Sequence, residues 1–251
     1  MMLSRARNDD PKRYEPPTSV VLIVWCGAVA LAIIGVSAAI GRGVFLTDLA
    51  TQAEPLRQEL LHSLQISDPF ALHRAQELDQ FDSRFAKHPL MTLLHIFPGG
   101  VFVTLALFQF SSRVRSRHIQ FHRWSGRILV LAGFAFGLTA LYFGLLMPYG
   151  GPTEAMAIVL FGVLFLGAIS RAFIAVRRHQ LACHREWMIR AFAVGIGIST
   201  ARIVLPVLDI TLTPAGFRSK EIFVLGLWTG WMITVGAAEL WIRYTRPRAA
   251  Q

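Results

Sequence analysis

Two histidine-containing segments of this chain could place imidazoles at the same depth of a membrane. HRWSGR begins at His122 and HREWMIRAF begins at His184, and each starts a long apolar run. Haem iron accepts two imidazoles from facing helices, and arginines near the membrane surface pair with its propionates. We therefore predict one haem b whose iron is ligated by His122 and His184, with Arg127 and Arg190 near the propionates.

Two alternatives for these histidines remain open. His118 and His122 are four positions apart, so they would share a helix face and could bind a divalent metal if the helix starts early enough. No third ligand accompanies them, and the sequence has no HExxH motif. Histidine, arginine and tryptophan also gather at membrane interfaces simply as anchors.

A second pair of polar residues, His95 and Arg202, lies well inside apolar runs. His95 is seven positions after His88, and Pro98 follows it closely, which predicts a loosened helix beside an ionisable group. A charged or titratable residue inside the membrane is a functional-site hypothesis by default. Arg202 could pair with Asp209, or it could contact an anionic headgroup, a propionate or a quinone carbonyl.

The spacing of His184 and Arg202 relates the two sites. They are 18 positions apart, which is about five helical turns, so both point the same way from opposite ends of one helix. Met188, Ala191, Gly195 and Ile198 fall between them on that face, and the small residues would allow close approach. A separate interhelical pair of Glu239 with Arg190 or Arg171 would neutralise charge at the inner level.

The rest of the chain has the composition of a membrane protein. Of its 251 residues 54% are hydrophobic and only 16% are charged. Runs long enough to cross about 30 Å of hydrocarbon predict an all-α, polytopic bundle of six transmembrane helices. These helices are expected near residues 20–40, 90–111, 127–147, 155–176, 187–208 and 222–242.

Charge distribution predicts the orientation of this bundle. Although the net charge is +10, the arginines gather in the 111–127 and 176–187 connections and in the tail. By the positive-inside rule both termini are cytoplasmic, and the basic residues contact anionic lipid rather than nucleic acid. We expect a multi-pass protein of a bacterial inner (cytoplasmic) membrane.

The predicted organisation has five parts. A cytoplasmic leader (1–19) precedes the first helix (20–40), and an extracytoplasmic loop (41–89) with two amphipathic helices (56–64 and 70–85) follows it. A five-helix core (90–242) and a basic tail (243–251) complete the chain. A cleavable signal peptide is the competing interpretation of the first helix, which exceeds the usual signal length of about 7–15 apolar residues.

The motifs HRWSGR and HREWMIRAF, together with His95 and Arg202, resemble the bacterial membrane family called domain of unknown function 2306. The resemblance covers roughly residues 90–210 and implies a multi-span membrane protein, without implying a substrate. The chain is also loosely similar to cytochrome b561-type bundles, which present two histidine pairs at two depths. Here His95 has no evident partner at the outer level.

These features favour a membrane protein that carries electrons through haem from a quinol-like donor to a redox partner. The alternative is a non-enzymatic transporter of a small molecule or ion that uses His95 and Arg202, or a structural membrane subunit. Whether the chain is an enzyme stays open. The sequence has no hydrolytic triad, nucleotide-binding loop or flavin fingerprint.

Overall fold

The computed structural model describes residues 16–45, 81 and 84–246, and within these ranges the chain is all-α, as predicted. Its helices are α1 (Thr18–Phe45), α4 (Pro89–Phe110), α5 (Ser112–Arg117), α6 (Ile119–Leu146), α7 (Pro152–Arg177), α8 (Leu181–Leu212) and α9 (Ser219–Thr245). Among the described residues, six helices are long and apolar enough to cross a membrane. Apart from residues 81, 84 and 85, the predicted amphipathic helices 56–64 and 70–85 lie outside the described ranges.

The helix boundaries follow from local chemistry. Proline stands in the first turns of α4 and α7, where the missing N–H has no intrahelical partner to lose. Gly151, directly before α7, has φ 73°, a conformation that glycine adopts without steric cost. Ser111 caps α5 by accepting from the Val114 N–H at 3.5 Å. Helix α5 was not predicted, because this short arginine-rich segment has no apolar face to mark it.

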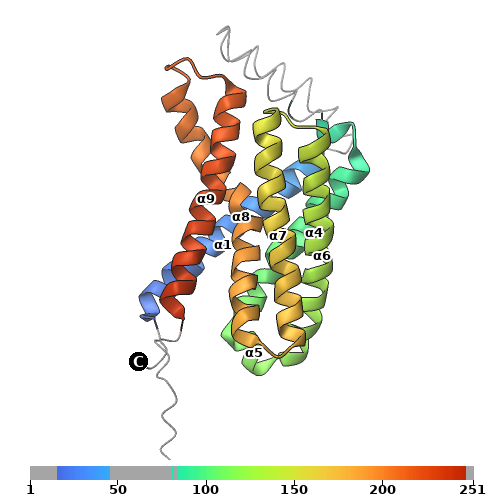
Figure 1. Ribbon diagram of the computed structural model, residues 1–251, viewed down its shortest axis with the longest axis vertical. Helices are drawn as coiled ribbons and strands as arrows, with labels where there is room; N and C mark the ends of the chain where they lie inside the picture. The colour runs from blue at the N-terminus through green and yellow to red at the C-terminus, as the bar shows by residue number, and fades with distance from the viewer. Residues whose placement is uncertain (1–15, 46–80, 82–83, 247–251) are drawn as a thin grey trace, which may run out of the picture.

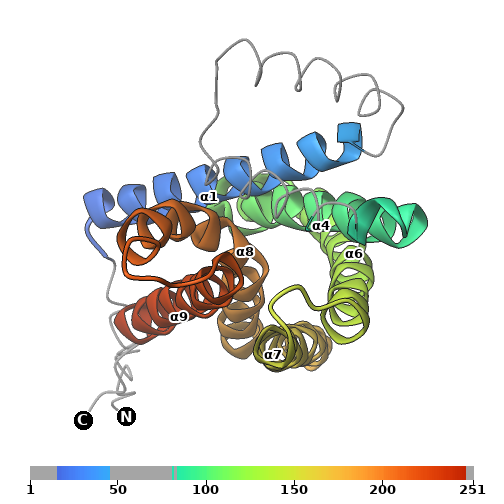
Figure 2. The same cartoon turned by 90° about the horizontal axis from the view of Figure 1, so that it is seen from above.

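Four long helices surround the interior of the bundle. Along the ring, α4 packs against α6, α6 against α7, and α7 against α8. Helix α1 crosses obliquely beside α4 and α8, and α9 packs along the outside of α8 (Figures 1 and 2). At one end of the molecule, α9 and the last part of α8 diverge from α6 and α7 (Figure 1). Pro206 lies inside α8 in that diverging part.

The two ends of the bundle differ in charge. The basic end carries α5, the connection after α7 and the last turn of α9, with Arg113, Arg115, Arg117, Arg178 and Arg243. The opposite end carries the turns between α6 and α7 and between α8 and α9. That the basic end faces the cytoplasm stays a prediction. Between the ends, Phe102, Leu129 and Ile169 are fully buried and fill the middle of the bundle.

Candidate functional site

A cavity of about 350 Å³ lies inside the bundle, in the half nearer the opposite end. Most of its lining comes from the second halves of α1 and α6, the middle of α4 and α8, the first halves of α7 and α9, and residues 81, 84 and 85 before α4. Most of the lining is apolar and much of it is aromatic: Phe81, Phe85, Phe136, Phe143, Phe161, Phe165, Phe223 and Trp231. The volume and the mixture of apolar wall with a few polar groups are typical of a small-molecule site.

Arg202 on α8 lines this cavity and has an exposed side chain. It makes no hydrogen bond or ion pair in the described part of the chain, so the hypothesis of an Arg202–Asp209 pair is wrong. Asp209 instead accepts a hydrogen bond from the Thr213 hydroxyl at 3.2 Å. Arg202 is therefore a guanidinium inside a membrane-spanning helix that the described residues do not neutralise.

Two more arginines reach the cavity from outside α8. Arg42 at the end of α1 lies over the Phe85 ring, 4.3 Å from its centroid. Arg84 lies over the Phe81 ring at 4.5 Å and donates to the Met147 carbonyl. Because guanidinium groups bind aromatic faces well, these contacts fix both charges at the rim of the cavity.

Glu154 is the acidic residue of the cavity lining. Its side chain is 4% exposed, and its carboxylate accepts a hydrogen bond from the Gly150 N–H in the turn that precedes α7. It lies in the first turn of α7, where the positive end of the helix dipole favours a carboxylate. Glu154 therefore holds the turn between α6 and α7 against the cavity wall.

His95 lines the cavity from α4, whereas His88 does not. The Nδ1 atom of His95 lies 3.1 Å from the Thr139 hydroxyl on α6. That hydroxyl donates its only proton to the carbonyls of Ala135 at 2.7 Å and Phe136 at 3.0 Å. Thr139 must then accept from His95, so Nδ1 carries the imidazole proton and Nε2 keeps a lone pair.

The face of α8 between His184 and Arg202 is confirmed. Met188 and Ala191 are buried in the core, while Gly195 and Ile198 line the cavity. A Cβ at Gly195 would come within 2.9 Å of the Phe102 ring, so glycine permits this close packing. One face of a single helix thus connects the basic end with the cavity.

His122 and His184 lie in the first turns of α6 and α8 at the basic end. The Nδ1 of His184 bonds the Ala172 carbonyl at 2.9 Å; since a carbonyl can only accept, Nδ1 holds the proton and Nε2 has the lone pair. The Nδ1 of His122 is buried and has no hydrogen-bond partner among the described residues. Neither residue lines the cavity described above.

The two arginines predicted to pair with haem propionates have other contacts in the structure. Arg127 lies over the Trp124 ring at 4.7 Å, and both side chains are exposed. Arg190 donates to both carboxylate oxygens of Glu239 on α9, with Nη2 to Oε2 at 3.0 Å. The predicted Glu239–Arg190 pair is thereby confirmed.

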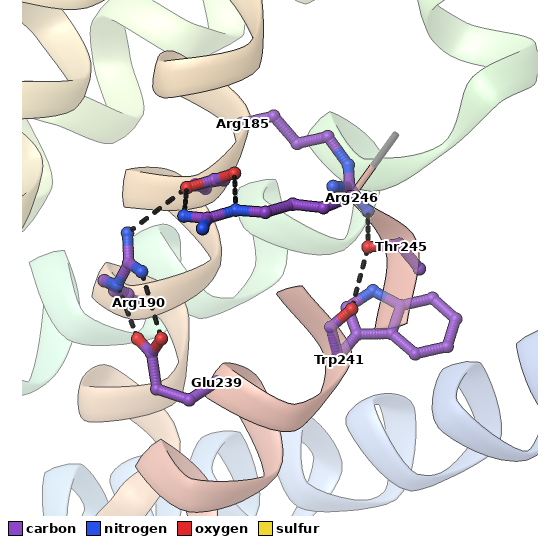
Figure 3. Close-up of polar contacts among 7 residues, drawn as sticks. Arg185, Arg190, Glu239, Trp241, Thr245 and Arg246 are labelled. Atoms are coloured by element: carbon purple, nitrogen blue, oxygen red, sulfur yellow. Dashed lines mark hydrogen bonds and ion pairs between the residues drawn. The ribbon is translucent and has the colours of Figure 1, made fainter. Parts of the chain in front are cut away.

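Arg190 belongs to a set of four charged residues that joins α8 to α9 at the basic end (Figure 3). Glu186 accepts two hydrogen bonds from Arg246, each 2.7 Å long, and its carboxylate lies 3.8 Å from Arg190. The hydrogen bonds to Glu186 raise the pKa of Arg246 above its ordinary value. We call Glu186, Arg190, Glu239 and Arg246 the clamp. Arg185 adds a bond of 2.8 Å to Thr245 (Figure 3).

Four residues of the cavity lining were not predicted to belong to a site: Arg42, Arg84, Glu154 and Trp231. A signal was present for two of them. Arg42 is the charged residue that ends the first apolar run, and Glu154 follows the turn MPYGGP at the start of another. Nothing in their spacing indicates that α1 and α7 bring them to one cavity.

Comparison with known proteins identifies the family of the chain. No curated protein and no solved structure matches it. The matching family model covers residues 92–242, so it includes both histidine motifs, His95 and Arg202, and extends past the predicted limit near residue 210 through α9. The match spans more than half of the chain, which therefore belongs to the family described as predicted membrane protein (DUF2306).

Proposed function

We propose that this protein binds an anionic amphiphile inside its helix bundle, with the anionic group against Arg202 and the apolar part among the aromatic rings of the cavity. This is the non-enzymatic, small-molecule alternative of the sequence analysis. The observation that carries the proposal is Arg202, a guanidinium within a membrane-spanning helix that lines a cavity and has no partner in the described residues.

The cost of burying charge supports an anionic ligand. An arginine within the hydrocarbon layer needs a counter-charge, water or a path to the surface, since its insertion is unfavourable by several kcal/mol. A carboxylate or phosphate can accept two parallel N–H bonds from one guanidinium. Arg42 and Arg84 add positive potential at the same rim, although their own ring contacts hold them in place.

The lining supports an apolar body attached to that anion. Phe136, Phe165 and Trp231 come from three different helices and face one space. Beyond it, toward the basic end, Phe102, Leu129 and Ile169 are fully buried. The ligand therefore occupies only the half of the bundle nearer the opposite end.

The test is equilibrium binding of radiolabelled dodecanoate to the protein in lipid nanodiscs, with empty nanodiscs subtracted. We expect saturable binding that weakens at least about tenfold in Arg202→Met, because a charge-assisted hydrogen bond contributes roughly 1.5–3 kcal/mol. The matched control is Arg127→Met, which removes an exposed arginine at the basic end and should leave the affinity within about twofold of wild type, because no proposed ligand contact is lost.

Two further ligands complete the test. Dodecanol has the same chain without the charge. It should compete poorly with labelled dodecanoate, and equally poorly for binding to wild type and to Arg202→Met. Acetate has the carboxylate without the chain, and competition by acetate at similar concentration would show a site for soluble anions instead. Equal dodecanoate binding by wild type and Arg202→Met would overturn the proposal.

A second candidate function, haem binding with electron transfer, is favoured by the state of the histidines at the basic end. His184 keeps a lone pair on Nε2, and the buried Nδ1 of His122 has no partner in the described residues. Neutral imidazoles with a free nitrogen are what haem iron requires, and bound haem would supply one-electron transfer. Against this, the arginines assigned to its propionates contact Trp124 and Glu239.

The haem candidate has a spectroscopic test. The protein would be expressed with haem precursor, purified, and measured oxidised and dithionite-reduced. A Soret band that His122→Ala and His184→Ala each abolish would support ligation by this pair. A band absent from wild type, or unchanged in both variants, would exclude it.

A further inference from the structure

We infer that His95 accepts a hydrogen bond from an O–H group of the ligand, which narrows the ligand class to hydroxylated anionic amphiphiles. This inference rests on the proposed function, since it concerns a second polar group in the same cavity. Arg202 recognises the anion, and His95 recognises a donor elsewhere on the same molecule.

The direction of one hydrogen bond carries the inference. The Thr139 hydroxyl has one proton, and its neighbours Ala135 O at 2.7 Å and Phe136 O at 3.0 Å can only accept it. The contact of 3.1 Å between Thr139 and Nδ1 of His95 therefore has the imidazole as donor. In this arrangement Nδ1 carries the imidazole proton and Nε2 is an acceptor.

The position of His95 directs that acceptor to the ligand. His95 lines the cavity, and its ring packs against Phe136 with centroids 4.8 Å apart. Among the described residues no side chain bonds Nε2, and the contacts of the ring with the Thr139 hydroxyl and the Phe136 carbonyl both call for an imidazole N–H. A buried acceptor without a donor loses the hydrogen bond that it would make with water. A ligand that brings an O–H donor into the cavity would restore that bond.

Arg202 and His95 are placed to act on one molecule. Both line the same cavity, from α8 and α4. Arg202 offers donors only, whereas His95 in this tautomer offers an acceptor. A ligand that satisfies both must carry an anionic acceptor and a separate hydroxyl donor.

The experiment compares dodecanoate with its 2-, 3- and 12-hydroxy derivatives in the nanodisc binding assay. In wild type we expect one of the hydroxy isomers to bind about three- to tenfold tighter than dodecanoate, the range that one neutral hydrogen bond supplies. In His95→Phe, which keeps a ring but removes both nitrogens, that advantage should vanish or reverse. The affinity of His95→Phe for dodecanoate is measured beside it, so that each preference is a ratio within one variant.

His95→Gln supplies the matched variant, because its amide oxygen can accept the same bond and should restore part of the preference. The ratio of the two affinities is the readout, so partial loss of folded protein does not change it. If all isomers keep the same ratios in wild type and His95→Phe, the inference is overturned while the proposed function stands. If wild type binds neither dodecanoate nor its derivatives, the proposed function fails as well.

Discussion

Two of the arginines of helix α8, Arg190 and Arg202, have completely different surroundings. At the basic end Arg190 forms two hydrogen bonds to Glu239 and lies 3.8 Å from Glu186. Nearer the opposite end, Arg202 lines the cavity and has no partner among the described residues. The protein therefore neutralises the charge of Arg190 with its own carboxylates. The charge of Arg202 is left for another molecule.

The difference separates structural charge from functional charge. A paired arginine within a membrane protein joins helices, and removing its partner costs stability. An unpaired arginine contributes little to holding helices together. Because an arginine inside the membrane is unfavourable, its presence needs an explanation other than helix packing. The clamp therefore belongs to the packing of α8 with α9, whereas we assign Arg202 to ligand binding.

Both arginines depend on the packing of α8 against α9. Disrupting that packing should have the largest effect on the free energy of unfolding. A Cβ at Gly230 would lie 2.6 Å from the backbone nitrogen of Ala201 and 2.8 Å from its Cα. Gly230→Ala must push the two helices apart, and we expect a loss of stability of about 3 kcal/mol or more. The measurement is the free energy of unfolding in mixed micelles with increasing sodium dodecyl sulfate.

Gly236→Ala is the matched control in the same helix, because a Cβ there meets nothing within 4 Å. It should be neutral or stabilising by less than about 1 kcal/mol. Equal stability of Gly230→Ala and Gly236→Ala would mean that the close approach of α8 and α9 does not hold in the membrane.

Breaking the clamp should have the next largest effect. Glu239→Met leaves Arg190 with the longer contact to Glu186 and its contact with the Trp187 ring, and we expect a loss of about 1–3 kcal/mol. The double variant Arg190→Met with Glu239→Met should recover part of it, since no unpaired charge remains. Arg246→Met should cost less than Glu239→Met, because that side chain is 55% exposed. Additive effects of the two clamp substitutions would contradict this pairing.

The smallest expected effect on stability is that of Arg202→Met without ligand. Because no pair is broken, the free energy of unfolding should change by less than about 1 kcal/mol, or rise. Arg190→Met, the same substitution at the other region, should destabilise by leaving Glu239 unpaired. Similar losses from both substitutions would remove the contrast and show that Arg202 is structural.

Much of the fold could be predicted, because the length of an apolar run and the residues that begin or end a helix are properties of one short segment of sequence. Each predicted span corresponds to a helix, and α4 begins at Pro89, one residue before the predicted start. The helices of the structure are longer than the predicted spans where polar residues continue a helix beyond the apolar run. Helix α6 begins at Ile119 and not near residue 127, so HRWSGR is helical.

The candidate site was only partly predictable. His95 and Arg202 stand out as polar residues within apolar runs, and the structure brings both to one cavity. The Arg202–Asp209 pair was wrong because helical spacing places residues on a face without saying what that face meets. Arg42 and Arg84 were missed because their place depends on how α1 and the residues before α4 pack against the bundle.

The sequence by itself determined an all-helical membrane protein, the approximate spans, the family and the shared face of α8. These depend on hydrophobic length and on a repeat of about 3.6 residues, which are properties of a single segment. Only the tertiary structure decided which arginine is paired and which lines a cavity, and that the imidazole of His95 presents a lone pair there. Such properties depend on atoms from different helices, because a charge or a hydrogen bond is satisfied by its neighbours in space.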